Sequence, residues 1–240
     1  MVSWLDQWAY RNRLSKLNAT FKLIFALILL IWALLGTNVV RLIIIVWLLV
    51  WLLGYARLPS SVCLRVCMLI SLVILGSSIP LLFSFDGAIH FISESFSYVS
   101  TVFLRAFTSS LVLFFLAATT PFFRIAHALS KWHVPKAFIE LLLLTYRFIF
   151  IVEKTAKELF VTVQIKRGER DWRFASLAVA QLLRQTLHHY EAMMIAQQAR
   201  NVSFAVPMCA DEQLPRRYVI EAFIGIVVLF ILEGLYATVS

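Results

Sequence analysis

The chain has 240 residues, of which 61% are hydrophobic and only 15% are charged. Soluble domains average about 45–50% and about 25%, and the 20 Phe, 7 Trp and 7 Tyr exceed what one water-facing globule could bury. The net charge of +9 favours an anionic membrane surface and argues against nucleic acid as a partner. The composition therefore predicts a protein whose main solvent is the lipid bilayer.

Five apolar segments of 17–21 residues are long enough to cross a membrane as helices. Basic residues precede the first segment, separate the second from the third and follow the fourth, whereas the loop at 85–98 has neither Lys nor Arg. Because cytoplasmic loops carry the excess of Lys and Arg, we expect the N-terminus and the basic segment after residue 120 to be cytoplasmic. The five predicted spans are 20–36, 39–56, 66–84, 99–119 and 218–238.

Residues 137–152 could be mistaken for a sixth span, but the charges in and around them form a stripe. At 100° per residue, the stripe is about 40° wide. Together with Glu153, Lys157 and Gln164 it forms a polar arc of about 140°, and the rest of the surface is almost wholly apolar. This pattern favours a long amphipathic helix at the membrane interface or in a groove of a membrane partner. A membrane crossing is the alternative. The stripe consists of Lys136, Glu140, Arg147, Lys154 and Glu158.

Prolines, a glycine and an asparagine mark the helices of the basic segment. Pro121 and Pro135 each stand at the start of a helix, and Gly168 ends the second one. A third helix covers about 172–200, and Asn201 can end it in a left-handed cap.

The predicted fold class is an all-α integral membrane protein in three parts. Residues 1–120 form a membrane domain of four spans, and residues 121–217 form a cytoplasmic or interfacial module of three amphipathic helices that ends in a loop. Residues 218–240 form the last span.

No catalytic constellation is visible in the sequence. The ionisable residues within the spans are too few for a proton relay or a metal cage, and His188 and His189 point about 100° apart on a helix. The sequence also lacks a phosphate loop of the GxxxxGK[ST] type. We therefore expect no enzyme activity, cofactor or metal site in this chain, and energy for uphill transport would come from a partner. The ionisable residues within the spans are Arg41, Arg105, Glu221 and Glu233.

Two of the amphipathic helices end alike, with an arginine at the C-terminus. One ends at Lys166-Arg167-Gly168 and the other, 33 residues later, at Ala199-Arg200-Asn201. The helix dipole favours a cation there, and a guanidinium group on a stiff rod could form bidentate bonds with carboxylates of a soluble partner. Compensation of the dipole alone would explain the same pattern.

These tripeptides resemble the paired Ala-Arg-Gly-type motifs of the transmembrane (T) component of energy-coupling factor (ECF) transporters. Further motifs resemble the cobalt-transport CbiQ branch of that family, and the similarity covers nearly the whole chain. The departures are Lys166 in the first motif and Asn201 in the second, and neither removes the arginine. The further motifs are Leu5-Asp6, Ala9-Tyr10, Asn12-Arg13-Leu14, Thr119-Thr120-Pro121, Val134-Pro135 and Leu144-Thr145-Tyr146-Arg147-Phe148.

The resemblance implies a coupling subunit in a bacterial or archaeal plasma membrane. It would join a dimer of ABC-type ATPases, which bind ATP and magnesium, to a membrane substrate-binding subunit that selects the metal. Arg167 and Arg200 would dock into the ATPases, and cobalt would precede nickel and a vitamin as the substrate. Candidates for contact with the substrate-binding subunit are Met193, Met194, Leu183, Leu187 and Phe148.

An alternative of a different class is an autonomous membrane carrier or enzyme. It would use Arg105, the deepest charge in the spans, together with the loop at 85–98. A structural cation paired within the helix bundle is the simpler interpretation of Arg105.

Overall fold

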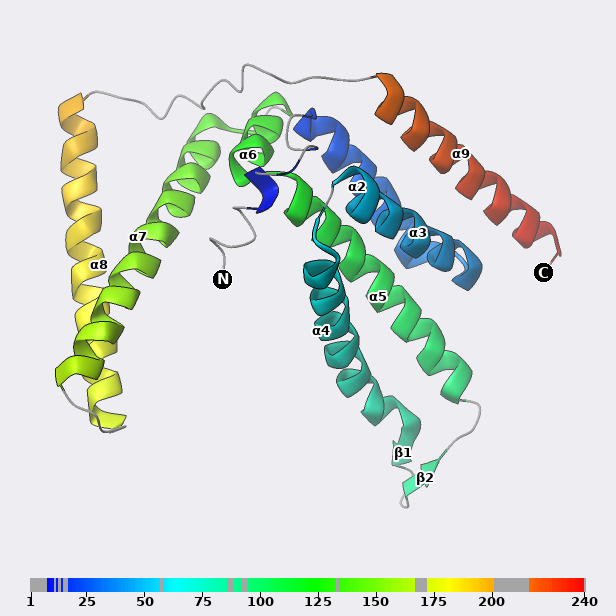
Figure 1. The fold of residues 1–240 in the computed structure, drawn as a ribbon, viewed down its shortest axis with the longest axis horizontal. Helices are drawn as coiled ribbons and strands as arrows, with labels where there is room; N and C mark the ends of the chain where they lie inside the picture. The colour runs from blue at the N-terminus through cyan, green and yellow to red at the C-terminus, as the bar shows by residue number, and fades with distance from the viewer. Residues whose placement is uncertain are drawn as a thin grey trace. The chain divides into compact units, whose positions relative to one another are not determined.

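The computed structural model describes residues 8–10, 12, 14, 17–56, 58–85, 89–91, 95–132, 134–166, 172–200 and 216–239 (Figure 1). The described part is helical apart from one hairpin, in which β1 (Phe83–Phe85) pairs antiparallel with β2 (Ile89–Phe91). The chain forms two compact units, one of Met1–Ile125 with Cys209–Ser240 and one of Ala126–Met208. The predicted class of an all-α membrane protein is confirmed, with the hairpin as a local addition.

The five predicted spans all coincide with helices of the first unit. Two of these helices are extended, α3 by a π-helical turn, η2 (Trp51–Tyr55), and α4 by a 3-10 turn, η3 (Ile79–Leu82). The five helices are α2 (Ala19–Leu35), α3 (Asn38–Val50), α4 (Ser60–Ser78), α5 (Ser95–Thr119) and α9 (Arg216–Val239).

Three stretches of the described chain are long and apolar enough to cross a bilayer, namely Asn38–Tyr55, Ser60–Leu81 and Ser97–Thr119. Helix α2 is also apolar but shorter, with 17 residues. The second stretch starts six residues before the predicted span at 66–84, because the extended Pro59 supplies the carbonyl that accepts the first helical hydrogen bond, 2.9 Å from the Val62 nitrogen. Arg65, expected in the connection before that span, is therefore an exposed residue of α4.

Helix α5 is the centre of the first unit and packs against α2, α3 and α4 (Figure 1). Its Phe115 is 1% exposed, and the ring lies edge-on to Phe25 and Trp51, with centroid distances of 6.3 and 6.1 Å. Such pairs contribute about 0.5–1.5 kcal/mol each beyond the burial of their area. Because lipid is as apolar as the side chains, packing of this kind holds membrane helices together.

Helix α9 belongs to the same unit and contacts α3 and its η2 turn. The ring of Tyr218, near the start of α9, lies edge-on to the Trp51 indole, with a centroid distance of 6.2 Å. Further along, Gly225 faces Trp47 so closely that a Cβ at Gly225 would lie 2.1 Å from the indole ring. The missing side chain therefore allows the two helices to approach each other.

Lys22 is a buried residue of α2 and connects three segments of the first unit. It is 3% exposed, and its Nζ donates to the carbonyl oxygens of Leu14 and, at 2.7 Å, of Thr119. The side chain of Asn12 donates to the neighbouring carbonyl of Ala118 at 3.4 Å. These donors satisfy carbonyls at the C-terminus of α5 that lack a partner within the helix. From the sequence we counted Lys22 among the basic residues at the start of the first predicted span, 20–36.

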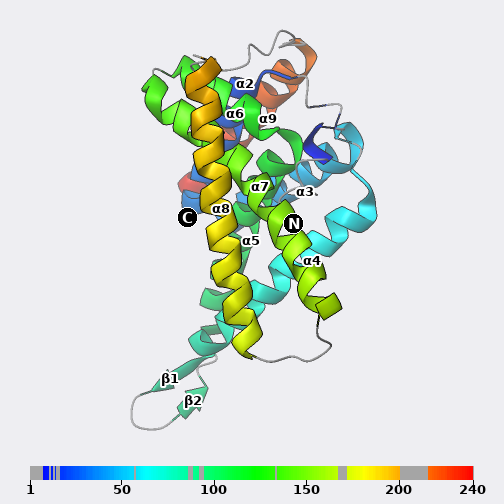
Figure 2. The ribbon, with the colours of Figure 1, turned by 90° about the vertical axis from the view of Figure 1, so that its left-hand side faces the viewer.

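The second unit consists mainly of two long helices, α7 (Lys136–Lys166) and α8 (Trp172–Arg200). A short helix, α6 (Phe122–Lys131), precedes them and begins within the first unit. The bounds of all three agree with those predicted from the prolines and from the tripeptides at the helix ends. Helices α7 and α8 lie side by side and run in opposite directions (Figures 1 and 2).

Candidate functional site

The C-termini of α7 and α8 lie at opposite ends of the α7–α8 hairpin. The last described residue of α7 is Lys166 and the last of α8 is Arg200, and the two helices are antiparallel neighbours (Figure 2). Helix α8 has 29 residues, which at 1.5 Å per residue correspond to about 43 Å. The described C-terminal ends of α7 and α8 are therefore about 43 Å apart along the hairpin.

The remaining residues of the two motifs are placed only in part. Ala199 lies in the last turn of α8 and is exposed. Arg167, Gly168 and Asn201 lie outside the described residues. That both helices end at or next to the predicted arginines fits the sequence analysis, whereas the role of the arginines in docking stays a prediction.

The polar stripe of α7 is on the surface along most of its length. Arg147 and Lys154 are exposed, whereas Ile139 and Leu143, nearer the start of the helix, are 2% and 3% exposed. Towards the end of the helix, Lys154 lies 3.9 Å from Glu158, an ion pair one turn apart that contributes little in water. The helix is amphipathic, as predicted, and it is not among the three stretches of the described chain that could cross a bilayer.

The predicted apolar face of α8 is largely uncovered in this chain. Val179, Leu183 and Leu187 are 65%, 61% and 53% exposed. Among the α8 side chains whose burial is described, the buried one is Thr186, whose hydroxyl group donates to the Leu182 carbonyl one turn earlier. Helix α8 therefore packs through a face beside the apolar stripe and leaves the stripe open.

Of the other residues predicted to contact a substrate-binding subunit, Phe148 lies where the two helices meet. The ring of Phe148 on α7 lies edge-on to Tyr190 on α8, with a centroid distance of 6.1 Å. Met193 and Met194 follow on α8 and are half-buried. Phe148 thus stabilises the hairpin itself, while Leu183 and Leu187 offer the accessible apolar surface.

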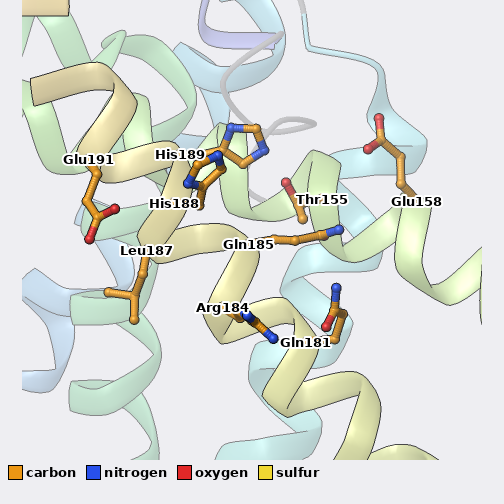
Figure 3. Close-up of a pocket in the computed structure, with 9 residues that line it drawn as sticks. All are labelled: Thr155, Glu158, Gln181, Arg184, Gln185, Leu187, His188, His189 and Glu191. Carbon is orange, nitrogen blue, oxygen red and sulfur yellow. The ribbon is translucent and has the colours of Figure 1, made fainter. Parts of the chain in front are cut away.

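A cavity of about 550 Å³ opens between α7 and α8 (Figure 3). His188 and His189 line it together with Arg184, Glu158 and Glu191, and both histidines are exposed. Within the described residues, no three His, Cys, Asp or Glu side chains are close enough together to hold a metal ion. The two histidines lie on a solvent-exposed face of α8.

Arg105, the residue of the alternative function, is an exposed residue of α5. The loop at 85–98 that was grouped with it contains β2 and the first turn of α5, and Asp86 and Glu94 in it lie outside the described residues. The structure places Arg105 near another cation, Arg41.

The fold and the hairpin define a class: a multi-pass helical membrane protein with a pair of long amphipathic helices that end in basic motifs. Residues 11–204 match the sequence profile of the CbiQ family, described as a cobalt transport protein. The chain therefore belongs to the CbiQ family.

Two relatives in this family illustrate the similarity. The cobalt transport protein CbiQ of Rhodobacter capsulatus is 34% identical over 90 residues, 36% of this chain and 37% of the relative. A fused cobalt transport protein, CbiMQ, of Methanocorpusculum labreanum is 30% identical over 121 residues, 48% of this chain and 20% of the relative. The aligned segments thus span well under half of either relative.

Proposed function

We propose that the chain is the transmembrane coupling subunit of an ECF-type ABC importer for cobalt. It would connect a dimer of cytoplasmic ATPases to a membrane subunit that binds the metal. Membership of the CbiQ family supports this role, and so does the sequence, which has no phosphate loop of its own. Nickel and a vitamin are the next candidates for the substrate.

The observation that supports the proposal is the separation of the C-terminal ends of α7 and α8, next to which the two arginine motifs stand in sequence. A dimer of ATPases offers the same groove twice. A stiff hairpin whose two helices end about 43 Å apart, each next to one motif in sequence, would suit one arginine in each groove. A guanidinium group at a helix C-terminus is favoured by the helix dipole and forms two parallel bonds with a carboxylate. Movement of the ATPases would then shift α7 and α8 as a rigid pair.

The uncovered stripe of α8 gives the hairpin a second surface for the membrane subunit. Leu183 and Leu187 expose more than half of their area, and apolar surface of this kind marks an interaction site. Because the described residues contain no group of three metal ligands, selection of the metal is assigned to the substrate-binding subunit. The N-terminus and the hairpin are assigned to the cytoplasm from the distribution of Lys and Arg.

The proposal is tested by reversing both charges with Arg167→Glu and Arg200→Glu in one chain. In membranes that also contain the partner subunits, we expect the ATPases to be lost on affinity purification from mild detergent. Uptake of radioactive cobalt should fall at least about tenfold, since each reversal places a carboxylate against a carboxylate. Competition by nickel would rank the two metals.

The matched control is Arg184→Glu, which reverses an exposed arginine in the body of α8. It should leave both the ATPases and the uptake near the wild-type level. Intact ATPase binding and normal uptake in the double variant, with the protein inserted in the membrane, would contradict the proposal.

A further inference from the structure

Arg41 is a buried cation that holds the turn between α2 and α3. Its side chain is 5% exposed, and Nε donates to the carbonyl oxygen of Ala33 at 3.0 Å while Nη1 donates to Asn38 Oδ1 at 2.7 Å. Asn38 in turn donates from Nδ2 to the hydroxyl oxygen of Thr101 on α5 at 3.0 Å. Since the last carbonyls of a helix lack a donor within it, Arg41 caps α2 and connects it to α3 and α5.

Two further charged side chains, from α9 and α5, lie near Arg41. A Cβ at Gly36, just after α2, would lie 3.4 Å from Oε1 of Glu233. Glu233 attracts the Arg41 guanidinium group, whereas Arg105 repels it. The three charged groups come from α3, α9 and α5 and sum to +1, so within the described residues the cluster lacks one carboxylate for neutrality.

Arg105 is the member of this cluster with an exposed side chain. Across the described residues, no hydrogen bond or ion pair of its guanidinium group is found. It lies within the apolar stretch Ser97–Thr119, about 12 Å from the Ser97 end at 1.5 Å per residue. A charge at this depth is costly unless it is paired, and it marks a functional contact.

We infer that Arg105 pairs with a carboxylate on a transmembrane helix of a membrane partner. The partner helix packs along the face of α5 that Tyr98, Arg105 and Leu113 form. At 100° per residue these three positions lie within about 80° of one another, and Tyr98 and Leu113 are 63% and 55% exposed. The face is therefore an apolar strip with one cation in it.

Charge complementarity selects the occupant of this face. The cluster lacks one negative charge, which a partner Asp or Glu supplies, while its apolar neighbours cover Tyr98 and Leu113. A lipid phosphate fits less well, because phosphates lie outside the hydrocarbon core and Arg105 lies about 12 Å inside the apolar stretch. The interface uses none of the residues on which the coupling proposal rests, so either can fail alone.

The test places a photo-crosslinking amino acid at Tyr98 or Leu113 of the full chain, in membranes that hold its partner subunits. We expect both positions to crosslink to an apolar, membrane-spanning segment that contains an Asp or Glu. Arg105→Glu should lower the yield about tenfold, as expected for loss of one interhelical polar contact and a new repulsion, whereas Arg105→Lys should retain most of it. Lys in place of the partner's carboxylate should restore crosslinking to the Arg105→Glu chain.

Two controls make the outcome decisive. Arg65→Glu reverses an exposed arginine on α4 and should leave the yield unchanged. Crosslinks to lipid only, a crosslinked segment without an acidic residue, or an unchanged yield with Arg105→Glu would each overturn the inference. So would an equal loss with Asp86→Asn or Glu94→Gln, because the carboxylate would then come from the chain's own loop.

Discussion

Lys22 shows at the scale of one residue how a cation can be structural in a membrane protein. Its ammonium group donates to the carbonyls of Leu14 and Thr119, and it thereby joins the N-terminal segment to the end of α5. Thr119 lies three residues before α6 begins. Lys22 therefore stabilises the point at which the chain leaves the membrane helices and continues to the hairpin.

Lys22→Met should lower the free energy of unfolding by about 2 kcal/mol, because a buried acceptor left without its donor costs about 1–3 kcal/mol. Thermal denaturation of the purified protein in detergent measures the loss. Arg65→Met, which removes an exposed cation from α4, should change stability by less than about 0.5 kcal/mol. Equal effects of the two substitutions would refute the role given to Lys22.

Individual residues differ in how far the sequence reveals their roles. Arg167 and Arg200 stand in short tripeptides at predicted helix ends, so a local pattern was enough to single them out. Arg41, Arg105 and Glu233 are brought together only by the packing of three helices, and no local spacing connects them. Lys22 was taken for a flanking charge because its acceptors, 8 and 97 residues away, are main-chain atoms.

At the scale of elements, the helices marked by proline, glycine or asparagine were predicted best. Helices α6, α7 and α8 begin and end close to their predicted bounds. The start of α4 was placed too late, because the polar Ser60 and Ser61 and the charge on Arg65 hid its first two turns. The β1–β2 hairpin was missed since two three-residue strands leave almost no periodic signal.

The position of α7 relative to the membrane can be decided with single cysteines in a chain whose three native cysteines are replaced by serine. If α7 lies at the interface, Arg147→Cys and Lys154→Cys should both react with a membrane-impermeant maleimide from the cytoplasmic side. Leu143→Cys, at a position that is 3% exposed, should not react. Protection of the cysteine at 147 while that at 154 is labelled would instead favour a helix that crosses the membrane.

At the scale of the whole molecule, the antiparallel arrangement of α7 and α8 was not predicted from the sequence. Two similar tripeptides 33 residues apart predict two similar helix ends, but they do not say whether these ends lie together or far apart. The contact of Phe148 with Tyr190 shows that α7 and α8 are neighbours. Because the two helices run in opposite directions, their C-terminal ends lie at opposite ends of the hairpin. The separation suggests two docking points rather than one.

The claim that one hairpin docks to two ATPase subunits is tested most directly by crosslinking from both of its ends. Lys166→Cys and Ala199→Cys, introduced together into the cysteine-free chain, keep both arginines and place a bifunctional crosslinker beside each. In the assembled transporter, the account predicts a product of one chain joined to two ATPase subunits. A product in which both cysteines join the same ATPase subunit, or no ATPase at all, would contradict it.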